Sequence, residues 1–307
     1  MIGFIQRRLL LAIPTVFAVS IAVFLMLHLI PGDPASIYLG ENLATPERLE
    51  RIRHEMGLDR PLHVQYLDFV GRALQGDLGR SLQNDRPVAL DIAERLPRTA
   101  ELAAAAFLVS VVFGVSLGIL SALRHNTWVD TLAMLVALVG VSMPIFWLGL
   151  LAILVFSIQL GWFPVTGQQG IASLVLPAAV LGIVSSATLA RLVRSSMLEV
   201  LRQEYVTTAR SKGLARRVVI WRHAFKNALI PVVTVLGLEV GSLLSGAVIT
   251  ETVFARPGIG KLVVDSIQSK DFTVVQGTIL LIAVTYVLVN LIVDVSYAFL
   301  DPRIRVS

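Results

Sequence analysis

The chain alternates long apolar stretches with shorter polar segments. An apolar run of about 18 or more residues is long enough for a helix to cross the hydrocarbon core of a bilayer. By this criterion we predict six membrane-spanning helices, over residues 9–30, 102–123, 131–160, 174–192, 229–249 and 275–299. The fold class that follows is an all-α polytopic membrane protein.

Prolines affect the expected shape of several of these spans. Pro144 lies inside the third span, and we predict a kink there, because proline removes a backbone hydrogen bond. Pro231 is predicted to open the fifth span, where its missing N–H costs nothing.

In the second span Gly114 and Gly118 are four residues apart, a spacing that lets two helix backbones approach closely.

The polar stretch between the fourth and fifth spans covers residues 191–231 and is strongly basic. Its two acidic residues, Glu199 and Glu204, face nine basic ones: Arg191, Arg194, Arg202, Arg210, Lys212, Arg216, Arg217, Arg222 and Lys226. Loops rich in lysine and arginine remain in the cytoplasm, and with six spans both termini then lie there too.

Inside this basic segment the pattern predicts a helix, a break at Gly213 and a second, amphipathic helix. The expected apolar face of the second helix consists of Val218, Trp221, Phe225 and Leu229. Two interpretations remain open on pattern alone. The helix could lie on anionic headgroups, or it could dock into a groove on a soluble cytoplasmic subunit.

Composition narrows the function classes further. Of the 307 residues 55% are hydrophobic, and the mean hydropathy is +0.77. The net charge of +5 is concentrated beside the spans, which is a topology signal, so we expect no nucleic-acid partner. The absence of cysteine excludes disulfides, thiolate nucleophiles and cysteine metal sites, and we expect no metal site in this chain.

The run from Tyr205 to Leu214, followed by Arg222, His223, Asn227 and Pro231, resembles the coupling loop of bacterial ABC-importer permeases of the peptide and nickel type. Further similar signatures occur in the expected order at residues 31–34, 56–79, 251–260 and 290–305. One departure is Thr207-Thr208-Ala209, where the wider importer family has Glu-Ala-Ala. The acidic contact of other branches therefore cannot be transferred, whereas the roles of Ala209 and Gly213 can.

The resemblance implies a type I ABC-importer permease fold in the bacterial inner membrane. Such a chain is a non-catalytic subunit that forms half of the path for peptides or similar small solutes. The implied partners are a homologous second permease, two ATP-binding subunits that carry ATP and magnesium, and an extracytoplasmic solute-binding protein. The residues implied to couple to the ATPases are Tyr205, Thr208, Ala209, Arg210, Lys212, Gly213 and Leu214.

The expected domain organisation follows the same resemblance. Residues 1–96 form an N-terminal span with an extracytoplasmic helical loop, residues 97–298 form the importer transmembrane domain, and residues 299–307 form a cytoplasmic tail. The coupling loop covers 193–229. In the outer loop we predict helices starting at Thr45-Pro46, from Leu62 to Leu74, and from Pro87.

Candidate residues of the translocation path lie in and after the fifth span. Glu239 is a carboxylate inside the membrane, which costs several kcal/mol unless it is paired or protonated, and both substrate contact and a structural role are open. The resemblance places Glu251, Phe254, Pro257 and Gly258 at the outer end of the path or its outer gate. In the sixth span, Asp294 is expected to pair with a basic residue near the inner surface.

The sequence leaves other functions open as alternatives. A secondary transporter would place coupling charges at the bilayer midplane, where only Glu239 lies deep. A permease for another solute, such as a nickel chelate, glutathione or haem, fits the same motifs. An intramembrane hydrolase would need a paired nucleophile and base, and the carboxylates of Glu239 and Asp294 are expected at different depths.

Overall fold

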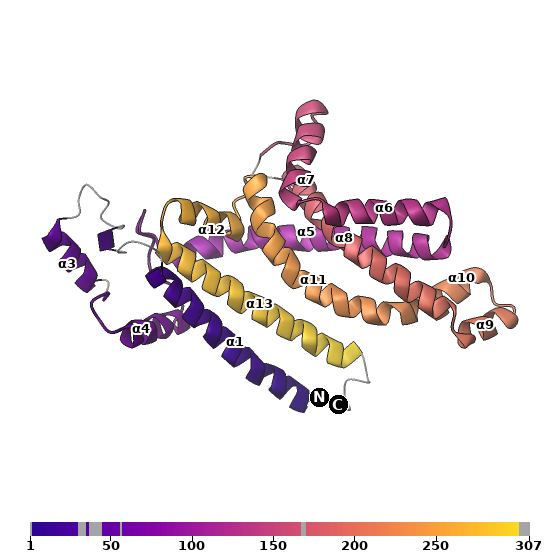
Figure 1. The fold of residues 1–307 in the computed structure, drawn as a ribbon, viewed down its shortest axis with the longest axis horizontal. Coiled ribbons are helices and arrows are strands. Elements are labelled where there is room, and N and C mark those ends of the chain that lie inside the picture. Colours follow the sequence, from indigo (N-terminus) through magenta and orange to yellow (C-terminus); the bar gives the residue numbers. More distant parts are fainter. Residues whose placement is uncertain (1, 30–34, 37–44, 56, 167–169, 301–307) are drawn as a thin grey trace. The chain divides into compact units, whose positions relative to one another are not determined.

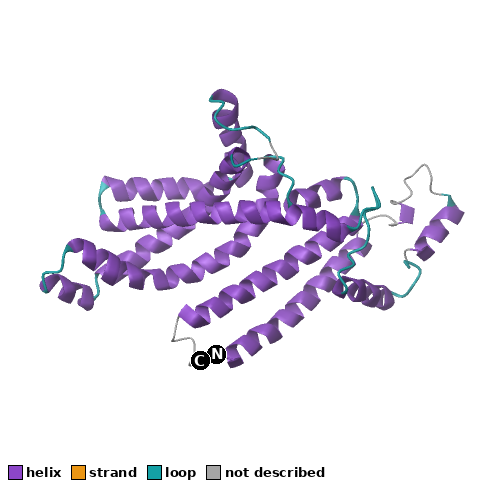
Figure 2. Ribbon diagram, turned by 180° about the vertical axis from the view of Figure 1, so that it is seen from behind, coloured by secondary structure: helices purple, strands orange, loops and turns teal. Residues whose placement is uncertain are grey.

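The computed structural model describes residues 2–29, 35–36, 45–55, 57–166 and 170–300. Over these ranges the regular elements are helices, apart from one isolated bridge between Arg80 and Pro87 (Figure 2). The chain forms two compact units. The first is built on Arg98–Gly260 with the end of the chain from Ile292, and the second on Ile2–Pro97 and Lys261–Leu291.

The first unit is a bundle around one central helix, α8 (Ala172–Leu201), which packs against both α6 and α11 (Figure 1). Its other elements are the inner part of α5 (Val88–Leu123), α6 (Trp128–Ser142), α7 (Ile145–Ala152), the π-helix η1 (Ile153–Gln159), α9 (Glu204–Ser211), α10 (Arg216–Val218), the π-helix η2 (Val219–Phe225) and α11 (Lys226–Val253). Leu189, Val193 and Met197 of α8 are almost fully buried in the main apolar core, with Ile119 of α5 and Val232 of α11.

The glycine pair of the second span explains how α5 approaches α8. A Cβ atom on Gly114 would lie 2.8 Å from the Cβ of Leu189, and one on Gly118 would lie 2.6 Å from the Cβ of Val193. Both distances are shorter than any normal carbon contact, so the absence of side chains at these two positions is what allows the two helices to touch. The close packing predicted from the four-residue spacing is confirmed.

The second unit contains α1 (Ile2–Leu29), α3 (Pro46–Glu55), α4 (Leu62–Leu74), most of α12 (Ile259–Gln268) and most of α13 (Phe272–Leu300). The predicted start of α3 and both predicted ends of α4 are confirmed. Ser20 and Tyr66 share a 2.7 Å hydrogen bond between α1 and α4, and His28 lies 3.1 Å from Gln65, so this histidine serves helix packing.

One predicted division of the outer loop is wrong. The helix expected from Pro87 and the second span are a single helix, α5, of 36 residues, which continues through Pro97. No glycine or turn sequence separates the two stretches, and one proline is too little to end a helix that is otherwise well supported. The predicted boundaries of the three domains stay predictions.

Among the described residues, five helices are long and apolar enough to cross a membrane, within Gln6–Met26, Val88–Leu123, Ala172–Leu201, Arg216–Val253 and Phe272–Val293. A sixth span arises if α6 and the following Ile145–Gln159 are counted together, which are bent by 106° at their junction. Met143 is extended there, with φ −91° and ψ 132°, as expected for a residue before proline. The kink predicted at Pro144 is confirmed, and it is sharp enough to break the span.

We predict that Gly118→Ala lowers the stability of the protein, because the new methyl group would collide with Val193 and the carbonyl of Ala190. Overpacking of this kind costs about 1–3 kcal/mol. Gly71 of α4 provides the matched control, since nothing lies within 4 Å of an added Cβ there. Thermal unfolding of the detergent-solubilised protein should show a lower midpoint for G118A and no decrease for G71A.

Candidate functional site

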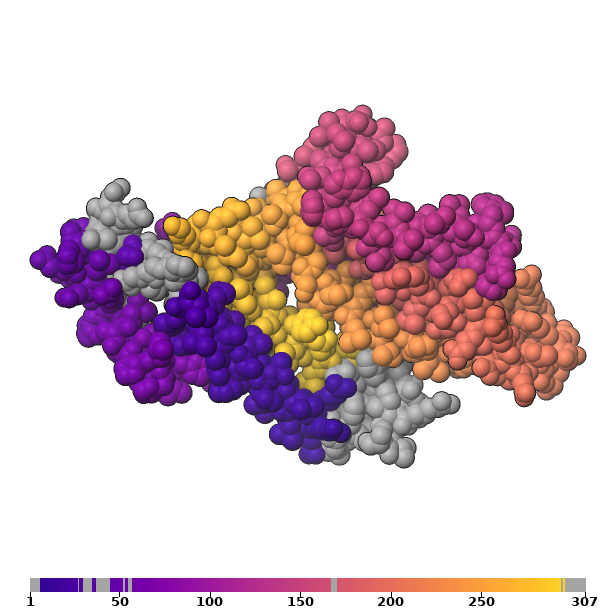
Figure 3. Space-filling model, in the orientation of Figure 1, coloured from indigo at the N-terminus to yellow at the C-terminus, as the bar shows by residue number. Residues whose placement is uncertain are grey.

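The basic segment folds into a compact knob at one end of the first unit, formed by α9, α10 and η2. In Figures 1 and 3 it lies beyond the ends of α8 and α11. Val206 and Ala209 of α9 pack on Val219 of η2 in a small apolar core of their own. Asn227 donates a 2.8 Å hydrogen bond to the Tyr205 hydroxyl, which lies 3.3 Å from the carbonyl oxygen of His223. The knob is therefore fixed to the start of α11.

Gly213 makes the turn between α9 and α10. Its φ is +76°, a conformation that L side chains rarely adopt, and its N–H donates a 2.9 Å hydrogen bond to the carbonyl of Arg210. Nothing lies within 4 Å of an added Cβ, so the requirement for glycine comes from the backbone and not from lack of space. The predicted break at this residue is confirmed.

The candidate coupling residues divide into two groups. Six are exposed on the knob: Tyr205, Thr208, Arg210, Lys212, Gly213 and Leu214. Ala209 is 6% exposed and faces Val219, so this residue supports the packing of α9 and offers little surface to another subunit. In the part of the chain that the structure describes, Arg210 and Lys212 form no ion pair. Both side chains are therefore available to pair with acidic groups of another subunit.

The predicted apolar face of the second helix is only partly right: Phe225 and Leu229 do pack against the main apolar core. Val218 and Trp221 are 38% and 51% exposed. The residues that η2 and the start of α11 bury are instead Val219, Ile220, Ala224 and Ala228. The cause is the π-helical backbone, whose wider turn rotates the following residues relative to the α-helical spacing on which the prediction depended.

The start of the fifth span also differs from the prediction. Helical backbone continues from Arg216 to Val253, so Pro231 lies inside the helix and does not open it. Proline is tolerated within membrane helices because neighbouring groups satisfy the freed carbonyl. The consequence is that the knob and the fifth span are one continuous helical element.

An ion-pair cluster that the sequence did not reveal joins the start of α6 to α8. Arg194 donates two hydrogen bonds to Asp130, 2.7 Å from Nε to Oδ1 and 2.8 Å from an Nη atom to Oδ2. Ser121 donates to Oδ1 of the same carboxylate, and the backbone N–H of Asn126 donates to Oδ2 at 3.1 Å. The cluster thereby holds together two residues that are 64 positions apart in the chain.

A second buried cluster lies where α11 ends and α12 begins. The carboxylate of Glu251 is fully buried; it accepts a 2.6 Å hydrogen bond from the Thr99 hydroxyl and a 2.8 Å bond from the N–H of Gly260. A Cβ on Gly258 would lie 1.9 Å from Oε1 of Glu251. Phe254 is 4% exposed within an apolar cluster, and Pro257 is half-buried. These four candidate residues build the outer end of α11.

Glu239 lies in a groove of 370 Å³ between α6, α8 and α11. The side chain is 8% exposed; its Oε1 accepts a hydrogen bond from Ser110, and no described residue bonds to Oε2. The lining residues are Val141, Val184, Ser185, Thr188, Leu189, Val235, Leu238, Glu239 and Ser242.

The side chain of Asp294 lies outside what the structure describes. Its expected pairing with a basic residue stays a prediction.

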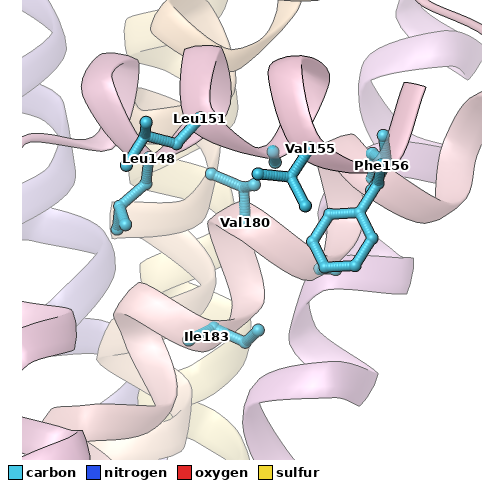
Figure 4. A pocket seen from close by; sticks show the side chains of 9 residues that line it. Leu148, Leu151, Val155, Phe156, Val180 and Ile183 are labelled. Atoms are coloured by element: carbon cyan, nitrogen blue, oxygen red, sulfur yellow. The ribbon is translucent and has the colours of Figure 1, made fainter. Parts of the chain in front are cut away.

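A separate pocket of 260 Å³ lies between the α7–η1 segment and α8 (Figure 4). Its lining is apolar and includes Leu148, Val155, Phe156 and Val180, whose side chains converge in the figure. Without a polar group to orient a solute, this pocket has the character of a packing or lipid-facing surface.

Comparisons with known proteins agree with this architecture. Residues 114–306 match the family described as "Binding-protein-dependent transport system inner membrane component", and residues 1–103 match the N-terminal part of such components. The chain belongs to this family. It is the non-catalytic, multi-pass permease of an ATP-driven importer of the inner membrane, and the secondary-transporter alternative is excluded.

Several relatives are similar over their whole length. The chain is 46% identical to the di/tripeptide transport system permease protein DppB of Pseudomonas aeruginosa, with 99% of each chain covered. It is 43% identical to the glutathione transport system permease protein GsiC of Escherichia coli K12, again with 99% of each covered. It is 42% identical to the dipeptide permease DppB of Alkalihalophilus pseudofirmus, covering 99% and 100%.

A solved amino acid ABC transporter, in a structure with histidines, shares the fold. The TM-score is 0.53 at 20% identity, with 69% of this chain and 94% of that chain covered. The predicted permease fold is thus confirmed. Family members work in importer complexes with ATPases and a binding protein, as the predicted partners require.

We predict that removing one side of the Asp130–Arg194 pair destabilises the first unit, because the other charge would stay largely buried without its partner. Asp130→Leu should lower the free energy of unfolding by about 2 kcal/mol. This is less than for a fully buried pair, because the Arg194 side chain is 27% exposed. The double variant D130L/R194L should recover a large part of that loss. Thermal unfolding of the two single variants and the double variant gives the coupling energy, and strictly additive losses would contradict a direct interaction.

Proposed function

We propose that this chain imports short peptides, including peptide-like solutes such as glutathione, as one half of a translocation path. A homologous second permease forms the other half, two ATP-binding subunits carrying ATP and magnesium lie on the cytoplasmic side, and an extracytoplasmic protein delivers the solute. The names of the relatives, which are permeases for dipeptides, di/tripeptides and glutathione at 42–46% identity, support this solute class.

The observation that carries the proposal is the knob at the end of α8 and α11. Its basic residues are exposed, and its own apolar core and the Tyr205–Asn227 hydrogen bond make it rigid. A rigid basic surface is suited to dock on a soluble subunit. Val206 and Ala209 are buried within the protein, whereas the exposed side chains of Val218 and Trp221 add apolar surface beside these basic residues, a combination common at protein–protein interfaces.

The mechanism follows from the continuity of the helices. α8 leads into the knob at Leu201, and α11 leaves it without a break, so a displacement of the knob is passed to two spans at once. ATP binding closes the two ATPases and moves the knob with them, and the spans then open the path outward. Such a shift requires that the ATPases bind the knob differently in the two states.

The direct test is reconstitution of the permease pair, the ATPases and the binding protein in liposomes. We expect uptake of dialanine that requires ATP and magnesium outside the liposome, on the side of the knob, and binding protein inside. Glutathione uptake, measured in parallel, separates the two solute classes. Uptake by the permease chains without ATPases, or ATP-driven uptake of neither solute, would contradict the proposal.

Gly213→Val should uncouple ATP hydrolysis from uptake. A β-branched residue at φ +76° costs at least about 1–2 kcal/mol and displaces the turn between α9 and α10. Gly213→Asn is the matched control, because asparagine tolerates this conformation and open space surrounds the site. We expect a lower ratio of transported dialanine to hydrolysed ATP for G213V and a normal ratio for G213N.

Cysteine cross-linking maps the docking surface without background from this chain, which contains no cysteine. Thr208→Cys and Lys212→Cys lie on the exposed side of the knob and should react with a bifunctional thiol reagent to capture an ATPase subunit. Val206→Cys, whose native side chain is 0% exposed, should not. Equal capture at all three positions would indicate non-specific contact and would count against docking through this face.

A further inference from the structure

The groove that contains Glu239 holds a carboxylate deep inside the membrane part of the first unit. Glu239 lies near the middle of α11, about 20 Å from each end at the helical rise of about 1.5 Å per residue. Only one of its oxygens is satisfied, since Ser110 donates to Oε1 and Oε2 has no hydrogen-bond partner among the described residues. A half-satisfied carboxylate at this depth is costly, and such groups mark solute pathways.

The surroundings of the carboxylate favour a cationic guest. Ser185, Thr188 and Ser242 add hydroxyl groups to the groove, and its other walls are aliphatic. None of the nine lining residues is lysine, arginine or histidine, so the lining provides no counter-charge for Glu239. A cation that entered the groove would meet a negative charge in a medium of low dielectric constant, where attraction is strong.

The geometry also distinguishes between kinds of cation. A guanidinium group binds carboxylates best through both oxygens, and here Ser110 already occupies Oε1. An ammonium group is a compact charge with three donors, which can bond to one carboxylate oxygen and to neighbouring hydroxyls. The volume of 370 Å³ is at the lower end of the range of about 300–1,000 Å³ for small-molecule sites, a size that suits a short peptide.

We propose that Glu239 binds the amino-terminal ammonium group of the solute during its passage through this groove. The inference rests on the proposed function, because short peptides and glutathione all carry a free primary amine. Oε2 is covered in the present conformation, and rotation about the last torsion of the side chain, which is broad in glutamate, brings an oxygen to the groove. Such a transit site binds weakly enough to release its guest.

The test uses the complete reconstituted importer with wild-type Glu239 or with Glu239→Gln, which keeps the shape and the bond from Ser110 but removes the charge. Each complex transports dialanine and, separately, N-formyl-dialanine, which has no ammonium group. The binding protein is the same in both complexes, so its own preference cancels from the ratio of variant to wild-type uptake for each solute. Glu94→Gln, which removes an exposed carboxylate outside the groove, is the matched control.

We expect E239Q to reduce dialanine uptake per hydrolysed ATP about tenfold or more, the size of a lost charged hydrogen bond, with little change for N-formyl-dialanine. E94Q should leave both ratios unchanged. An equal reduction for both solutes would overturn the proposal in favour of a structural role or a pairing with a side chain of the second permease. No reduction for either solute would overturn it as well.

A second measurement keeps the proposal testable if the formylated peptide is transported too slowly. Thr188→Cys places a thiol in the groove of a chain that otherwise has none. During turnover, dialanine should protect this thiol from N-ethylmaleimide when Glu239 is present, and protection should be lost in the T188C/E239Q double variant. Identical protection in both would overturn the inference. A wild-type importer that takes up no peptide at all would instead refute the proposed function.

Discussion

The structure depends on the requirement that polar groups inside a membrane protein find partners within the protein. Water is absent from the bilayer core, so each buried charge or backbone group must be satisfied by its neighbours. Asp130 and Arg194 meet this requirement for each other, and Glu251 meets it with a hydroxyl and a backbone N–H. These contacts fix which helices lie together. Apolar side chains cannot do so alone, because lipid tails are as apolar as the side chains of a neighbouring helix.

Glu239 is the exception to this requirement. Its carboxylate is buried to a degree similar to those of the structural pairs, yet one oxygen has no described partner. A protein can retain such a group when a transient guest completes the set of bonds. The same low dielectric constant that makes Asp130 a strong clamp would then make Glu239 sensitive to a passing cation.

Close helix packing connects these sites to the knob. Gly114 and Gly118 allow α5 to touch α8, and α8 is packed against both α6 and α11. Well-packed interfaces of this kind shift between discrete arrangements and do not deform continuously. In the proposed mechanism, contact between these rigid helices is what would pass movement of the knob to the walls of the groove.

Much of the architecture could be predicted from the sequence, because spans, breaks and caps depend on local properties. Apolar length identified the spans, Pro144 identified the bend, and Gly213 identified the turn of the knob. The spacing of residues could not show that η2 is π-helical, and the predicted apolar face was displaced as a result. Pairs such as Asp130 with Arg194 join distant positions, and no local pattern in a single sequence indicates which charge will meet which.

The Glu251 cluster has a mechanical consequence for the outer end of the bundle. One carboxylate holds the Thr99 side chain of α5 and the backbone of Gly260 simultaneously, while the Thr99 hydroxyl accepts a 2.8 Å bond from the N–H of Ile259. If any one of these three segments moved away, its hydrogen bonds to the other two would be broken in a dry interior. The three backbones must consequently travel as a single block, and the hinge for any outward motion has to be sought elsewhere along the helices.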